Sequence, residues 1–407
     1  MKRRIATKRG LIAMAVACAF TAPAAMADVT ISGAINIGIE IGKSSSDTAG
    51  NPGLTTTQLH PSYSHMDIDS TDDIGNGNKV MFHYQFDISG TSSANPTAAG
   101  GAIGNRNSSL GIGGTWGAFK VGTNENVYER LMYQADPLDG AVGPGGNLNI
   151  LGTPGAGTVF EVGQSGCLAN GCVGFYRRAE QQVWYESPNW NGFTFEVDYT
   201  LSAFKFNGGP GVGTVDPKII SIGGKWQPEG MPFYVDLAYE KHDDMFGLFK
   251  ISGSTSTGSN DTGIQVGAGY TLGDLGLHAR YETLKYKLDG SNAVSQYKRN
   301  AFWFAAKYNL PSGYVGGEIG IADDGTCTDA VAGSCVAGSL DKDTGARMFG
   351  VGYFHNLSKQ TQLQFIYART DNDTNATYLQ IGAATGAGLP GAGADHQVFD
   401  VRMKHTF

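Results

Sequence analysis

The feature that most constrains this chain is its last eleven residues, 397–407, which alternate strictly between two faces. One face is mostly apolar and includes Phe399, Val401, Met403 and Phe407. The other face is mostly charged and includes Asp400, Arg402 and Lys404. A period of two predicts a β-strand, and a terminal strand without a partner leaves an open edge. Residues 29–41 offer a matching row of isoleucines. Pairing of the first strand with the last therefore predicts a closed barrel.

Residues 1–27 have the pattern of a secretory signal peptide. A basic start precedes a short apolar run at 11–20, and Ala25-Met26-Ala27 is a cleavage site. We expect the mature chain to begin at Asp28. Five of the 29 basic residues lie in the signal, so 24 basic residues face 37 acidic ones, a formal charge of −13. Such an acidic chain argues against nucleic acid as a partner.

Sixteen segments after the signal have the alternation of strands, and most approach the 9–11 residues that cross a bilayer as a tilted strand. They are residues 29–41, 62–70, 79–89, 106–115, 117–123, 178–187, 193–201, 218–227, 233–242, 262–273, 275–287, 299–309, 313–322, 345–357, 360–370 and 397–407. We expect the fourteen prolines to lie in the signal, between these segments or at their ends, because proline disrupts an interior strand.

The connections between these segments alternate between short turns and long loops. Short turns at one rim and long loops at the other are typical of outer-membrane barrels, and a soluble sandwich has no reason to sort its loops this way. The inward rows carry too many charges to pack as a dry core, and sixteen strands leave an aqueous channel. The sequence thus predicts an all-β protein: a sixteen-stranded antiparallel transmembrane barrel in a lipid bilayer, with a wet interior.

Several segments resemble those of a known family, the Gram-negative general-diffusion porins, particularly those of betaproteobacteria. The resembling segments are the opening strand with Gly33, the segment 64–77, Arg106 with 110–117, the turn Tyr185-Glu-Ser-Pro-Asn-Trp-Asn-Gly192, the turn at 353–361 and the closing Arg402-Met-Lys-His-Thr-Phe407. Their order and spacing span the mature chain. The resemblance implies a passive channel for ions and small hydrophilic solutes in the outer membrane of a Gram-negative bacterium, assembled as a homotrimer. It also implies outer-membrane assembly machinery as a partner, with Phe407 at the barrel closure.

The chain departs from the family pattern at four positions. His65, Thr123, Trp184 and Gln360 stand where the family has arginine. These departures weaken any transfer of the family's basic wall, and with it any anion preference.

The resemblance identifies loop 124–177 as a constriction loop that folds into the pore after the fifth strand. Its acidic residues are Glu125, Glu129, Asp136, Asp139 and Glu161. We expect Asp136 and Asp139, with Glu125 and Glu129, to form the acidic side of the constriction. The alternative is that they are solvated loop acids, because loop residues reach function often but not selectively.

The basic side is expected from residues at lumen-facing positions: Arg178, Arg280, Arg402 and Lys404. Opposed charges would create a transverse field across the pore; the alternative is that these residues only solvate the interior. Other lumen-facing residues are Asp67, Asp69, Asp198, Asp236 and His278. The four aspartates would favour cations.

Four cysteines remain after processing. Cys167 and Cys172 lie in loop 124–177, whereas Cys327 and Cys335 lie in loop 323–344. Short intervals in an oxidising compartment predict two local disulfides. A zinc site is the alternative, but neither loop has a histidine. Acidic stretches at 323–325 and 371–375 lack the full calcium-loop pattern, so we expect no bound metal and no cofactor.

No catalytic constellation is present. Ser165 lies in Gly-Gln-Ser-Gly, but Cys167 follows where a nucleophile elbow needs glycine. We therefore expect no enzyme activity. Two alternatives to a general-diffusion porin stay open. One is a porin selective for a sugar or organic acid, in which Trp184 and Trp303 form a stacking track. The other is a secreted or surface-attached β-rich adhesin.

Overall fold

The computed structural model describes residues 28–88, 103–138, 143–156, 174–176, 178–201, 206–207, 214–245, 258–288, 293–380 and 391–407. Five features expected above lie outside these ranges: the signal 1–27, Asp139, Glu161, Cys167 and Cys172. None of the helices within the described ranges is long and apolar enough to span a membrane.

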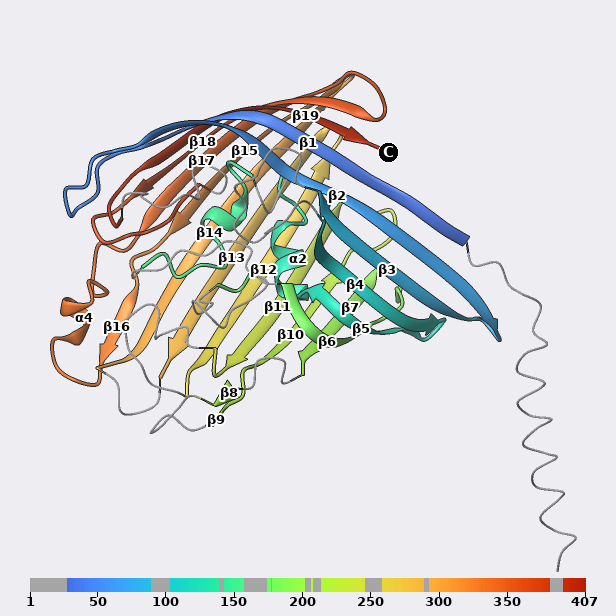
Figure 1. Cartoon of the computed structure of the whole chain (residues 1–407), viewed down its shortest axis with the longest axis horizontal. Helices are drawn as coiled ribbons and strands as arrows, with labels where there is room; N and C mark the ends of the chain where they lie inside the picture. The colour runs from blue at the N-terminus through green and yellow to red at the C-terminus, as the bar shows by residue number, and fades with distance from the viewer. Residues whose placement is uncertain are drawn as a thin grey trace, which may run out of the picture.

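Antiparallel strands form a single closed barrel (Figure 1). Its sixteen strands are β1 (Asp28–Ser44), β2 (Thr55–Gly75), β3 (Asn78–Ile88), β4 (Ile103–Gly114), β5 (Gly117–Glu125), β6 (Arg178–Glu186), β7 (Phe193–Thr200), β10 (Lys218–Trp226), β11 (Phe233–Asp243), β12 (Asn260–Leu272), β13 (Leu275–Lys287), β14 (Val294–Leu310), β15 (Gly313–Ala322), β17 (Ala346–Asn356), β18 (Thr361–Asn372) and β19 (His396–Thr406). The predicted fold class is confirmed.

The barrel closes between β1 and β19, as the terminal alternation predicts. Their register runs from Ala34 opposite Thr406 to Ser44 opposite His396. At the end of the seam, the backbones of Gly33 and Phe407 exchange two N–H···O bonds of 3.1 Å each. The structure therefore places Phe407 at the closure, and no strand edge is left open there.

The outer face of the barrel is apolar. Alternate residues such as Ile35, Ile39 and Leu237 are exposed along their strands, and exposed tryptophans stand near the short turns at positions 116, 190 and 226. This apolar face with an aromatic border suits a bilayer and its interface.

Two strands begin five or more residues earlier than predicted. β2 begins at Thr55 rather than at residue 62, and β14 begins at Val294 rather than at 299. The expectation that every proline avoids strand interiors is wrong at Pro61, which pairs with Ile37 inside β2. The exception has a physical reason. Within the described residues, β2 pairs with β3 only from His65 onward, so Pro61 lies where β2 has β1 as its single described neighbour.

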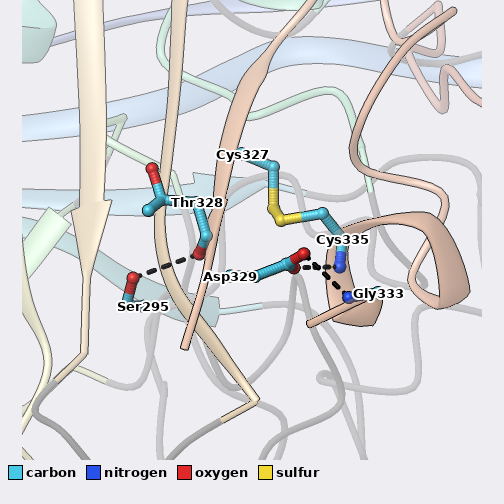
Figure 2. Close-up of a disulfide and its surroundings, with 6 residues drawn as sticks. All are labelled: Ser295, Cys327, Thr328, Asp329, Gly333 and Cys335. Atoms are coloured by element: carbon cyan, nitrogen blue, oxygen red, sulfur yellow. Dashed lines mark hydrogen bonds between the residues drawn. A yellow bond between two sulfur atoms is a disulfide. The ribbon is translucent and has the colours of Figure 1, made fainter. Parts of the chain in front are cut away.

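The long loops contain additional short strands and a helical turn. β8 (Phe206–Asn207) pairs with β9 (Thr214–Val215), and β16 (Thr326–Asp329) adds to the extended end of β14. A disulfide joins Cys327 of β16 to Cys335 of the helical turn α4 (Ser334–Ala337) (Figure 2). The predicted local pairing of these two cysteines is thus present. The Asp329 carboxylate accepts bonds from the backbone N–H groups of Gly333 and Cys335, at 3.0 and 2.5 Å.

The barrel interior holds a hydrophobic cluster, contrary to the expectation of a fully wet lumen. The described residues 126–138 and 143–156, here called the inward segment, contain α2 (Val127–Tyr133) and the 3-10 turn η1 (Asn147–Asn149), which lie inside the ring of strands (Figure 1). The apolar side chains of the inward segment pack against inward residues of β11, β13, β14, β15 and β17. The described residues of the strands β2–β7 contribute no side chain to this cluster.

Glycines on the inner wall make room for this packing. A Cβ at Gly263 would lie 2.8 Å from the Phe175 ring, and one at Gly320 would lie 2.6 Å from Ile150. Gly350 is equally close to Leu138, at 2.5 Å. Larger side chains at these inward positions would hold the segment away from the wall.

Candidate pore constriction

Wall residues position the start of α2. The backbone N–H of Val127 donates to Asp198 Oδ2 at 2.6 Å, and that of Tyr128 donates to Ser221 Oγ at 3.2 Å. These wall acceptors satisfy N–H groups of the first helical turn, which have no partner within the helix. Arg130 forms an ion pair with Glu196 of β7. The helix is therefore fixed to the barrel at its first turn and along one side.

A buried ion pair contacts the inward segment near both of its ends. Glu282 of β13 and Arg299 of β14 lie 2.8 Å apart, and neither side chain is exposed. Glu282 accepts the backbone N–H of Gly152 at 2.9 Å and the Tyr128 hydroxyl at 3.0 Å. Arg299 donates to the carbonyl oxygen of Thr153 at 2.6 Å. One ion pair thus fixes both ends of the inward segment.

Asp136 links the two halves of the same segment. Its carboxylate accepts the backbone N–H groups of Leu138 at 2.8 Å and Asn147 at 2.6 Å. It is also hydrogen-bonded to the carboxyl of Glu318 on β15. Asp136 is engaged in holding the loop, rather than standing as a free acid facing the pore.

A charged cluster lies where β5 leads into α2. Glu125 is 2.6 Å from Arg178 and 3.6 Å from Arg106, and it accepts a 2.5 Å bond from the Tyr133 hydroxyl. The Arg106 guanidinium also stacks over the Tyr63 ring at 4.6 Å. We call these five residues the Glu125 cluster. It joins α2 to the wall of β2–β6.

Glu129 lies on α2 beside this cluster. Its side chain is buried, and its Oε2 atom has no hydrogen-bond partner in the described part of the chain. Burial raises the pKa of Glu129 to about 8, and the adjacent Glu125 carboxylate acts in the same direction. Glu129 is therefore mostly neutral at pH 7.

Comparison with known proteins decides what this barrel is. The profile of the Gram-negative porin family matches residues 13–375. The chain belongs to that family. It is 25% identical over 401 residues to outer membrane porin protein 32 of Delftia acidovorans, covering 98% of this chain and all of that relative.

Solved structures share the fold of this porin. An anion-selective porin from Comamonas acidovorans superposes with a TM-score of 0.71 at 20% identity, over 94% of this chain and all of that one. OmpT of Vibrio cholerae in its trimer form gives 0.57 at 13% identity, over 94% and 99%. With the closed barrel and the family match, the protein is a passive diffusion channel of the outer membrane of a Gram-negative bacterium.

The arginines expected to form a basic wall in this porin are paired with nearby carboxylates. Arg280 is paired with Asp236 at 2.7 Å, and Arg402 with Asp400 at 3.1 Å. All four side chains are almost fully buried. Arg178 bonds Glu125 directly rather than facing it across an opening. Lys404 is half-buried. Local pairing therefore neutralises most of the charges that were expected to oppose each other.

The other expected lumen residues also have close partners. Asp67 accepts from Gln85 at 2.8 Å and lies 3.3 Å from His65, and Asp69 lies 2.8 Å from His83. Asp198 and Asp236 are buried in the contacts described above. His278 is hydrogen-bonded to the Tyr234 hydroxyl at 3.1 Å.

Two tryptophans that would have formed a stacking track are unavailable to solutes. Trp184 is 3% exposed and Trp303 is not exposed at all. Their indole N–H groups donate to Glu186 and Glu318, at 2.9 and 3.1 Å. Both rings are covered, and Trp303 belongs to the hydrophobic cluster inside the barrel, so the sugar-track alternative has no exposed aromatic face at these positions.

Several site residues were missed from the sequence. Arg106 and Tyr133 complete the Glu125 cluster, and Glu282 with Arg299 anchors the loop. Inward parity alone could have suggested Arg106, Glu282 and Arg299, because each lies on a polar row of its strand. Tyr133 gives no such signal, because its position depends on how the loop folds.

Proposed function

We propose that ions and small hydrophilic solutes cross this porin past the Glu125 cluster, through the part of the lumen lined by β2–β5. The inward segment supports this proposal, because it fills the side of the lumen along β10–β18 with apolar packing. The polar wall of β2–β5, whose inward side chains are mostly partly exposed, is then the water-accessible side. Transport is passive, and we expect no catalytic activity.

The charges near the cluster predict a weak cation preference at neutral pH. Arg106 and Arg178 supply two positive charges, whereas Glu125, Asp67 and Asp87 supply three negative ones. Glu129 adds little at pH 7 because it is mostly protonated. The preference is small because nearly every charge has a partner within 4 Å.

A planar bilayer under a KCl gradient tests this assignment. We expect stable conductance steps and a reversal potential of cation-preferring sign. Glu125→Gln should move that potential toward anions, because two arginines lose their shared carboxylate. Asp371→Asn, at the exposed loop end of β18, is the matched control and should leave it unchanged. Wild-type steps with no shift in Glu125→Gln would refute the site; absence of steps from folded protein would refute the open channel.

We also propose a homotrimer, a cleaved signal peptide of residues 1–27 and recognition of the closing strand by the outer-membrane assembly machinery. The resemblance and the trimer form of OmpT support the first of these. Native mass measurement of the detergent-extracted protein should give three copies with an N-terminus at Asp28. Deletion of Phe407 should reduce the amount of folded protein in the outer membrane.

A further inference from the structure

A second segment folds into the lumen from the opposite end of the sequence. Residues 372–380 begin at the last residue of β18 and continue into a long loop, yet Ala376, Tyr378, Leu379 and Gln380 are all buried. Ala376 and Tyr378 belong to the same hydrophobic cluster as the first inward segment and the inner wall. Residues 376–380 therefore pack inside the barrel instead of standing in solvent.

This second segment binds the first one directly. Ala156 and Ala376 form an antiparallel bridge, and the backbone N–H of Thr377 donates to the carbonyl oxygen of Gly155 at 2.8 Å. The Tyr378 ring lies against Gly155 so closely that a Cβ there would stand 1.8 Å from it. Gly155 has a φ of +64°, a backbone conformation that favours glycine.

Gln380 extends the contact to the centre of the first segment. Its Oε1 atom accepts the backbone N–H of Gly145 at 2.8 Å and the Asn149 amide at 3.3 Å. Its Nε2 atom donates to Thr370 Oγ1 of β18 at 2.6 Å. One buried amide therefore ties the constriction loop to the barrel wall through the last loop.

The same loop also reaches the outermost part of the first loop. Thr48 donates its hydroxyl to the carbonyl oxygen of Thr374 at 2.7 Å, and its N–H to that of Ala392 at 2.9 Å. The Asp47 carboxylate accepts the N–H of Gly391 at 2.8 Å. A continuous set of contacts thus runs from the loop after β1, through 372–380, to the constriction segment.

We propose that residues 372–380 are a second constriction element of this pore, which sets its solute size limit and holds the first inward segment in place. This inference rests on the proposed function, because it concerns the same lumen. The segment occupies part of the entrance by its own bulk. It also restrains residues 145–156 through Gln380 and Tyr378, so loosening it should widen and destabilise the opening.

A cross-link tests the placement independently of channel activity. Bridged antiparallel residues have Cα atoms about 4.5–5.5 Å apart, which lies within the range of a disulfide. Ala156→Cys with Ala376→Cys should therefore cross-link under mild oxidation, detected by mass spectrometry of peptides. The two single-cysteine variants are the controls. Failure of the double variant to cross-link in folded barrels would overturn the proposed placement.

Measurements of unitary conductance and of the solute size limit test the role of residues 372–380 as a constriction. Tyr378→Ala and Gln380→Ala should raise the unitary conductance, increase open-channel noise and admit larger sugars in liposome swelling. Thr374→Ala removes an exposed side chain from the same segment but retains the carbonyl that Thr48 uses, and it should behave as wild type. A cross-link that forms, together with unchanged conductance and exclusion in both variants, would overturn the role. Absence of any steps from wild type would instead refute the channel itself.

Discussion

Titration of Glu129 offers a sharp test of the constriction. With a pKa of about 8, this side chain is roughly 10% ionised at pH 7 and roughly 90% ionised at pH 9. The pore therefore gains nearly one negative charge beside Glu125 over this interval. We expect the cation preference of the wild type to increase with a midpoint near pH 8.

Glu129 gives the stability of the loop packing a pH dependence opposite to that given by an ordinary paired carboxylate. The folded chain holds the proton of Glu129 up to about pH 8, whereas an unfolded chain releases it near 4.5. Ionisation therefore opposes the packing, and stability from this group is lost as the pH rises from about 4.5 to about 8. Open-channel noise should increase over the upper part of that range.

Reversal potentials at pH 6, 7 and 9 under one KCl gradient measure the effect. Glu129→Gln keeps the shape and a neutral side chain, so it should remove the step near pH 8. Asp371→Asn lies outside the constriction and should keep the step. An equal step in wild type and Glu129→Gln would show that another group titrates, and the reasoning about Glu129 would be wrong.

Three further changes test the anchors of the inward segments. Arg299→Met leaves the buried Glu282 carboxylate without its ion-pair partner, so urea unfolding should show that the free energy of unfolding falls by about 3–5 kcal/mol. The control Arg369→Met removes an exposed ion pair and should lower it by about 0–1 kcal/mol. Equal losses in the two variants would contradict the role of Arg299 as an anchor. Cys335→Ser opens a short loop whose closure contributes about 2–3 kcal/mol of local ordering, so protease cleavage at this loop should increase while the conductance stays unchanged. Gly155→Ala would place a methyl group 1.8 Å from the Tyr378 ring, so the yield of the 156–376 cross-link should fall. The control Gly230→Ala has a similar positive φ but no neighbouring atom within 4 Å, and it should retain the cross-link.

The barrel could be predicted from the sequence because the alternation within each strand shows which of its side chains face outward and which face inward. The alternation at 397–407 and 29–41 predicts the β1–β19 seam without knowledge of any loop. The start of β2 was missed because Pro61 argues against a strand, and only its single-neighbour position makes it acceptable. Parity thus predicts strands well and their ends less well.

The constriction was less predictable, because parity says that a side chain points inward but not what covers it. Arg280 and Arg402 do point inward, yet each is neutralised by an aspartate and buried. Asp136 satisfies backbone groups of its own loop. These outcomes depend on how a long loop folds against the wall, which has no periodic signal in the sequence. The glycines at inward positions 263, 320 and 350 are a sequence signal for this packing, because side chains of the inward segment approach them closely.

The division of the inner wall has a consequence for how this protein tolerates change. Along β10–β18, an inward position belongs to a protein interior, so glycine and alanine there are constrained by volume as in any core. In the proposed pore, inward positions along β2–β5 border water, so charge matters more than volume there. The same geometric face of one barrel therefore follows two sets of substitution rules. Mutations that alter selectivity should concentrate in β2–β5, whereas mutations that disturb the opening by loosening its supports should concentrate from β10 onward.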